Sequence, residues 1–220
     1  MKTLTAIVAV CAALSLLPSQ ASAAAIITNL TPGLYNAGLG DLEAMDGPGG
    51  FLVGPFSSEG DPTIVLGADP GFSFTAAFGT DWLGGDYSGG TWSAVPVAIP
   101  ASWDINTETA IVYDFTLATA SNLHIDLGVD NGIVVWLDGS FLFGATAAGG
   151  AFLGEYDIDV PSLSAGTHSL QILRADHGGG QDYAILANAE PVAVPEPSSL
   201  LLSAFSLAGL MARRKKAMPR

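Results

Sequence analysis

The sequence predicts an all-β fold, most simply a single β-sandwich or jelly roll. Its 220 residues are rich in Gly, Ala, Thr, Val and aromatic residues but poor in Lys, Glu and Gln, which favours strands over helices. Short apolar segments recur along the chain, with turn-forming residues between them. In the second half these segments alternate apolar and polar residues, which is the pattern of a strand with one buried face. Short strands at near-regular spacing are typical of sandwiches and jelly rolls.

The first half of the predicted domain, residues 24–100, is punctuated by Gly and Pro. Its short apolar segments are Ile26–Leu30, Phe51–Phe56, Thr63–Leu66, Phe72–Phe78 and Thr91–Ile99. No linker-like break separates this half from the next. We therefore favour one domain over residues 24–190, rather than a separate lobe for residues 24–100.

The second half shows clearer strand patterns. Ile111, Tyr113, Phe115 and Leu117 share one face of a predicted strand, and so do Leu123, Ile125, Leu127 and Val129, with His124 and Asp126 pointing outward. Further strands are expected at Ile133–Leu137, Phe141–Phe143, His168–Leu173 and Tyr183–Ala187. Asn-Gly and Asp-Gly accept positive φ, so we expect tight turns at Asp130-Asn131-Gly132 and at Asp138-Gly139.

The segment 127–140 carries a more specific signal, together with Leu163–Leu170 and the later loop Gly178–Gly180. In this order the three segments resemble the extracellular galactose-binding-like and PA14-like jelly rolls. The resemblance covers about residues 105–190 and implies carbohydrate binding. The calcium-dependent PA14 lectins have an Asp-Asp pair where this chain has Asp130-Asn131, so the chain departs here from the pattern of their metal-dependent sugar site.

Residues 1–23 are predicted to be a signal peptide. A positive start at Met1-Lys2 precedes the apolar segment Ala6–Leu17, and Ala21-Ser22-Ala23 forms a small-x-small cleavage site. The mature chain is expected to begin at Ala24. The single cysteine, Cys11, lies inside the apolar segment, so the mature protein has neither disulfides nor thiol chemistry.

Residues 191–220 contain three parts in a specific order. Val194-Pro195-Glu196-Pro197 comes first, followed by the apolar run Ser198–Met211 and the basic cluster Arg213-Arg214-Lys215-Lys216. The segment resembles the PEP-CTERM sorting signal of exported bacterial proteins. A membrane-spanning helix takes roughly 20 apolar residues, so this short run suits a transient sorting helix whose basic end stays cytoplasmic.

The resemblance implies an exosortase-type enzyme as a partner, which acts near the Pro-Glu-Pro. It also implies an inner-membrane intermediate with a periplasmic domain, which is then delivered to the cell surface or the extracellular matrix. The alternative is an ordinary C-terminal anchor that is never cut.

The predicted domain is strongly acidic. Residues 24–190 contain 20 acidic residues and one basic residue, Arg174, which is a net charge of −19. Such a field repels nucleic acid and anionic membrane surfaces, and it tolerates or recruits divalent cations. We expect no nucleic-acid partner, and we expect stability to rise with ionic strength or calcium.

Oxygen-bearing side chains suggest a calcium site. Asp126, Asp130, Asn131 and Asp138 carry the hard oxygen ligands that calcium prefers. The simpler interpretation, which we favour, is that Asp130, Asn131 and Asp138 form turns by bonding to their own backbone.

Candidate ligand-binding residues are Trp82, Trp103, Asp130 and Asn131. Each of the two tryptophans lies beside an aspartate in a polar loop, where stacking on a sugar and packing in a core are equally plausible. Arg174 and His177 could face a ligand, although we favour a simple ion pair for Arg174.

The sequence carries no catalytic motif and predicts a non-enzyme. No nucleophile elbow is present, and His124 is the first histidine, so the serine-protease-like segment Gly85–Gly90 lacks a preceding base. The leading hypothesis is an exported protein that binds or organises exopolysaccharide or envelope glycans. The alternatives are a structural biofilm or matrix protein without a sugar ligand and a glycan hydrolase.

Overall fold

The protein is an all-β sandwich, as the sequence predicts. A computed structural model describes residues 22–42, 65–66, 78, 80–147, 150–176 and 180–193. These residues form nine strands: β1 (Ala24–Thr28), β2 (Leu34–Asn36), β3 (Val65–Leu66), β4 (Glu108–Leu117), β5 (Ser121–Leu137), β6 (Ser140–Ala147), β7 (Tyr156–Leu163), β8 (Gly166–Ala175) and β9 (Asp182–Pro191). Every pairing between these strands is antiparallel.

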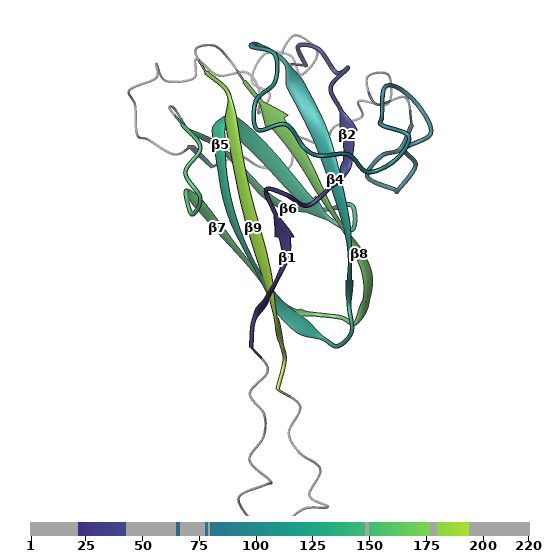
Figure 1. Cartoon of the computed structure of the whole chain (residues 1–220), viewed down its shortest axis with the longest axis vertical. Coiled ribbons are helices and arrows are strands. Elements are labelled where there is room, and N and C mark those ends of the chain that lie inside the picture. The colour runs from purple at the N-terminus through teal and green to yellow at the C-terminus, as the bar shows by residue number, and fades with distance from the viewer. Residues whose placement is uncertain are drawn as a thin grey trace, which may run out of the picture.

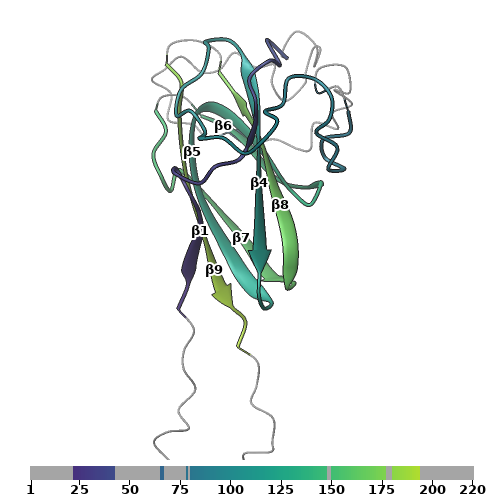
Figure 2. The same cartoon turned by 45° about the vertical axis from the view of Figure 1, so that its right-hand side comes forward.

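The strands form two layers (Figures 1 and 2). Sheet I has the order β1-β9-β5-β7, and sheet II has the order β2-β4-β8-β5-β6-β3. β1 and β2 from the first half of the chain pair with β9 and β4 from the second half. The two halves therefore contribute strands to the same two sheets.

The long strand β5 belongs to both sheets. Its residues 121–130 pair with β9, whereas residues 132–137 pair with β8. The predicted Asp130-Asn131-Gly132 turn is therefore wrong, because the chain crosses from sheet I to sheet II there without reversing. At this crossing Gly132 allows close approach, since a Cβ added to it would lie 3.3 Å from the Ala175 Cβ.

The second predicted turn is confirmed. β5 ends at Leu137 and β6 begins at Ser140, so Asp138 and Gly139 form the two-residue connection. Both have positive φ, 51° and 75°, which is the conformation that Asp-Gly favours in a hairpin.

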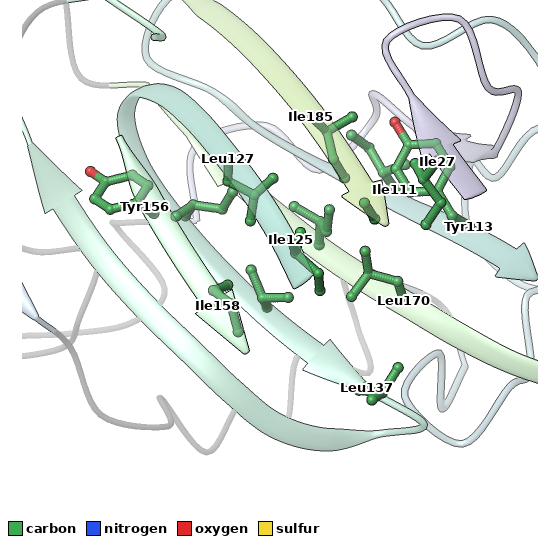
Figure 3. Packing of buried hydrophobic residues seen from close by; sticks show 14 of the residues in the cluster. Ile27, Ile111, Tyr113, Ile125, Leu127, Leu137, Tyr156, Ile158, Leu170 and Ile185 are labelled. Atoms are coloured by element: carbon green, nitrogen blue, oxygen red, sulfur yellow. The ribbon is translucent and has the colours of Figure 1, made fainter. Parts of the chain in front are cut away.

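The main core lies between the two sheets (Figure 3). The predicted inward-facing residues of β4 and of the first half of β5 are all buried there: Ile111, Tyr113, Phe115, Leu117, Leu123, Ile125, Leu127 and Val129. Ile158, Leu170 and Ile185 pack against them from the other strands. Full burial of such a side chain contributes about 1.5–3 kcal/mol, so this interlayer core is the main source of stability.

A second apolar cluster covers the outside of sheet II. The strand residues on that side, which we call the covered face, are Ala110, Val112, Val134, Trp136, Leu173 and Ala175. Leu39, Leu42, Phe78 and Trp82 pack over them from the preceding connections. Residues 108–113 of β4, 132–137 of β5 and 170–175 of β8 are thus buried on both sides of sheet II.

Among the described residues, no second apolar cluster covers the outside of sheet I. Its outward-facing polar residues, which we call the open face, are Asn122, His124, Asp126, Asp157, Asp159, Asn188 and Glu190. Each is exposed or half-buried and alternates with a core residue. The predicted outward orientation of His124 and Asp126 is confirmed.

The predicted signal-peptide cleavage site and the predicted sorting signal adjoin the first and last strands of the sandwich. Ala24 pairs with Ala189, so the start of β1 and the end of β9 lie side by side at one end of the molecule (Figure 2). Residues 1–21 of the predicted signal peptide and residues 194–220 of the predicted sorting signal lie outside the described residues. Among the residues that are described, no helix has the length and hydropathy needed to cross a membrane.

Candidate functional site

The structure places Trp82 inside the second apolar cluster. It is 4% exposed, and its ring stacks on Phe78 with centroids 4.7 Å apart. The edge of Trp136 packs against it at 5.5 Å. Trp82 is therefore packed among other rings and offers no open surface to a sugar.

Trp103 is also buried, and it belongs to a cage around Arg174. The Arg174 guanidinium lies 4.2 Å from the Trp103 ring centroid, 4.7 Å from Tyr183 and 5.7 Å from Tyr35. Nη1 of Arg174 donates a hydrogen bond to the Pro100 carbonyl, and Nε donates one to the Thr109 hydroxyl. The cage holds the cation by stacking and neutral hydrogen bonds.

Arg174 thus fulfils neither sequence-based expectation. It is fully buried, so it cannot present itself to a ligand, and no carboxylate of the described residues lies within ion-pairing distance. Burial lowers the pKa of its guanidinium, and the surrounding tyrosines oppose that effect. His177 lies outside the described residues.

The four predicted calcium ligands lie in three places. Asp126 is on the open face, while Asp130 and Asn131 are buried at the crossing of β5, where the Asn131 amide donates to the Asp130 carboxylate. Asp138 lies in the β5–β6 turn, accepts a hydrogen bond from the Ser169 N–H and contacts His168. At about 3.3 Å per residue along β5, Asp126 and Asp138 are tens of ångströms apart. The structure does not bring the four together.

The open face brings other residues together instead. In the strand register, His124 lies opposite Asp159 on β7 and Asn188 on β9, and Asp126 lies opposite Asp157. Cross-strand neighbours on one face have Cβ atoms about 5 Å apart, within reach of one another. Antiparallel pairing therefore assembles a compact polar group from three strands, β5, β7 and β9, that are far apart in the sequence.

The histidine of this group has a carboxylate on each side. Its Nδ1 lies 2.8 Å from Asp159 Oδ1, and its Nε2 lies 3.3 Å from Asp126 Oδ1. The hydrogen bond with Asp159 is the largest cause that raises the pKa of the His124 imidazole, and the negative charge of Asp126 adds to it. The open face thus favours positive charge at its centre.

An exposed apolar loop borders the same group. The backbone of Phe152 lies directly over Gly128, where an added Cβ would meet the Phe152 carbonyl oxygen at 2.3 Å. Gly128 is two residues from Asp126 along the same side of β5. Phe152 and Leu153 are 71% and 51% exposed, and Glu155 fastens the loop by accepting a hydrogen bond from the Val129 N–H.

A shallow hollow of about 470 Å³ adjoins His124 on the other side. Asn122, His124, Asp159, Pro161, Asn188 and Glu190 are among its lining residues. Carboxylate, amide and imidazole groups there can donate and accept hydrogen bonds, while Arg174 is buried elsewhere. The arrangement suits a neutral ligand rich in hydroxyl groups, or a cation, and it disfavours an anion.

Sequence reasoning missed the residues of β7 and the loop before it. Residues 156–160 read Tyr-Asp-Ile-Asp-Val, an alternation that predicts a strand with both aspartates on one side. That pattern would have found Asp157 and Asp159. Phe152 has no comparable signal, because its position over β5 depends on the tertiary fold.

Comparison with known proteins gives one sequence match. Residues 193–216 match the PEP-CTERM protein-sorting motif. A comparison with curated proteins gives no match. The similarities to solved structures are partial, and the first of them is to an anti-sigma factor domain-containing protein (10% identity, TM-score 0.33), covering 43% of this chain and 36% of that one.

Two other similar structures come from named carbohydrate-related proteins. One is a GH2 beta-galacturonidase from Eisenbergiella tayi (16% identity, TM-score 0.36), covering 47% of this chain and 22% of that one. The other is a PA14 sugar-binding domain from an RTX adhesin (14% identity, TM-score 0.27), covering 45% of this chain and 52% of that one. The chain thus spans about half or less of the length of each of these structures.

The sorting motif indicates how the chain is exported. Its three parts lie in the order that the sequence predicts, and the match begins at the last described residue after β9. The chain therefore carries the PEP-CTERM protein-sorting motif and is an exported protein of an exosortase-type system, with a transient membrane-anchored stage.

Proposed function

We propose that the protein binds neutral exopolysaccharide or envelope glycans through the open face of sheet I, at the cell surface or in the extracellular matrix. The observation that carries this proposal is the position of Phe152. Phe152 is exposed, and its backbone lies over Gly128, two residues from Asp126 on the open face, whereas the outside of sheet II is covered.

The chemistry of the open face fits a sugar. The face of an aromatic ring suits the C–H face of a pyranose, and Phe152 and Leu153 together expose apolar surface next to polar groups. Asp126, Asp157 and Asn188 supply acceptors and donors for hydroxyl groups beside it. Phe152 thus provides contact area, and the polar residues provide orientation.

The charge of the domain narrows the class of glycan. Residues 24–190 carry a net charge of −19, and their one basic residue, Arg174, is buried. Uronic-acid or sulfated polymers would meet the repulsion of this net negative charge. Neutral glycans are therefore the favoured ligands.

We infer binding rather than catalysis at this face. The carboxylates of Asp157 and Asp159 stand on an exposed edge strand, where solvent is not excluded. Acid–base catalysis of glycoside hydrolysis depends on a carboxyl group in a protected environment with a raised pKa. Release of reducing sugar from purified matrix would contradict this inference.

The test is binding of the full chain, in mild detergent, to a panel of neutral and acidic polysaccharides that includes the exopolysaccharide of the host. We expect saturable binding to a neutral glycan and an affinity loss of about tenfold in Phe152→Ala, which is about 1.4 kcal/mol. Val95→Ala is the matched control, because Val95 is 63% exposed but lies beside β2 of sheet II.

Two outcomes would contradict glycan binding at this face. One is no binding to any polysaccharide, which would favour a structural matrix protein without a sugar ligand. The other is an equal loss in Phe152→Ala and Val95→Ala, which would place binding elsewhere on the molecule.

A further inference from the structure

Three side chains that can ligate a metal converge on the open face. β5 contributes His124 and Asp126 on the same side, and β7 contributes Asp157 opposite Asp126. One ligand atom from each residue lies within 4.8 Å of the others. Ligand atoms held about 2.1 Å from a common ion are at most about 4.2 Å apart, so a small rotation of the exposed Asp157 side chain closes the set.

The hydrogen bonding of His124 also indicates a cation at this place. An ionised Asp159 can only accept, so in the neutral imidazole the ring proton lies on Nδ1, 2.8 Å from Asp159 Oδ1, and Nε2 carries the lone pair. That lone pair faces the Asp126 carboxylate at 3.3 Å. Two acceptors this close need a positive charge between them, either a second proton on the imidazole or a metal ion.

The group as a whole has the form of a metal site with an outer carboxylate. Histidine ligands in proteins usually donate their second N–H to a carboxylate or carbonyl, which fixes the ring and raises its basicity. Asp159 stands in that position behind His124. The other ligands, Asp126 and Asp157, would balance the charge of a divalent ion.

We propose that His124 Nε2, Asp126 and Asp157 bind a divalent transition-metal ion, with Zn²⁺ as the best fit, and that Asp159 positions the histidine. One imidazole nitrogen and two carboxylate oxygens match the ligands of Zn²⁺. Calcium prefers six to eight oxygen ligands, so a set of three that includes an imidazole nitrogen favours a transition metal over calcium. Three protein ligands leave a position open for water or another oxygen.

Calorimetric titration of the metal-free full chain with Zn²⁺ tests the proposal, and it needs no glycan. We expect one site in the wild-type chain and at least a tenfold loss of affinity in Asp126→Asn and in Asp157→Asn. The control is Glu190→Gln, which removes one negative charge from the same face without touching the three ligands, and its Zn²⁺ affinity should stay within about twofold of wild type.

Asp159→Asn tests the positioning role. Loss of such an outer carboxylate lowers metal affinity about 10- to 100-fold. The melting temperature of the metal-free variant should equal that of the wild type, since Asp159 is exposed. A fall in metal affinity with unchanged metal-free stability would separate positioning from folding.

A direct readout is the NMR spectrum of the histidine side chains. The chain has three histidines, and Zn²⁺ should shift the signal of one, which His124→Gln removes. No binding up to millimolar Zn²⁺, equal affinity in all variants, or a shift of a different histidine would overturn the proposal. Because no sugar is present, failure here leaves the glycan proposal intact, and failure of glycan binding leaves this one intact.

Discussion

The outer faces of the two sheets differ sharply, although both belong to one sandwich. The covered face of sheet II presents Val112, Val134 and Trp136 to an apolar layer formed by the preceding connections. The open face of sheet I presents His124 and Asp126 to solvent and to the strands beside them. The first side extends the core, whereas the described residues of the second expose polar side chains to solvent.

The strand β5 contributes to both the open face and the covered face. Residues 121–127 alternate between buried and more exposed positions, whereas residues 132–137 are buried at every position. The change follows the crossing from sheet I to sheet II at Asp130 and Asn131. An alternating pattern thus marks a strand with one uncovered face, and a continuous apolar pattern marks a strand covered on both.

The largest expected effect is on the covered face. Trp136 is 1% exposed and packs against Trp82, so Trp136→Ala should lower the free energy of unfolding by about 3–5 kcal/mol. Its counterpart on the open side, Phe152→Ala, should change it by less than about 0.5 kcal/mol. Chemical denaturation of both variants checks the comparison, and similar losses in the two would remove the distinction between the faces.

The next largest effect is expected at Arg174, the buried cation between the sheets. Arg174→Lys keeps the charge but loses the planar group that stacks on Trp103 and bonds to Pro100 and Thr109. We expect a loss of about 2 kcal/mol in the free energy of unfolding. The same denaturation experiment measures it, and a variant as stable as wild type would mean that the cage recognises charge alone.

A smaller effect is expected at Gly128, where the loop that carries Phe152 packs on the open face. Gly128→Ala places a Cβ 2.3 Å from the Phe152 carbonyl oxygen, so the loop must move, at a cost of about 1–2 kcal/mol. Because Phe152 moves with it, glycan affinity should fall as well. Gly132→Ala is the control in the same strand, since its nearest contact is a side-chain carbon at 3.3 Å. An unchanged glycan affinity in Gly128→Ala would argue against Phe152 as the contact.

The interlayer core was predictable because local pattern and tertiary role agree there. The alternation from Leu123 to Val129 identifies the buried side of β5 without further information. At Asp130–Gly132 the local turn preference is overridden, because the ladders of both sheets continue through the crossing.

The candidate site was predictable only in part. The outward positions of His124 and Asp126 follow from the alternation of apolar and polar residues in β5. The same kind of alternation at residues 156–160 indicates the outward positions of Asp157 and Asp159. Trp82 was predicted as a ligand-binding candidate from its polar neighbours in a loop. Those neighbours do not show what the loop packs against, and here Trp82 packs on the covered face of sheet II. Which loop lies on which face depends on contacts between distant segments, and a single sequence does not contain that information.

The smallest expected effect concerns pH and the histidine of sheet II. Burial of His168 opposes protonation, but hydrogen bonds to Asp138 and to the Ser164 carbonyl outweigh it, and the pKa of the imidazole is raised. A raised pKa in the folded state means that protonation stabilises the fold. The contribution is complete below the unfolded value of about 6.5 and is lost as pH rises through the folded pKa.

Thermal unfolding of wild type and His168→Gln from pH 5 to pH 9 measures this contribution. We expect the difference in melting temperature to be largest at pH 5 and to shrink above about pH 6.5. The corresponding difference in the free energy of unfolding should be below about 1 kcal/mol, because Asp138 is partly exposed. Asp138→Asn should flatten the profile in the same way. A difference that grows toward alkaline pH would reverse the sign of the shift, and His168 would then be a neutral core residue of the covered sheet.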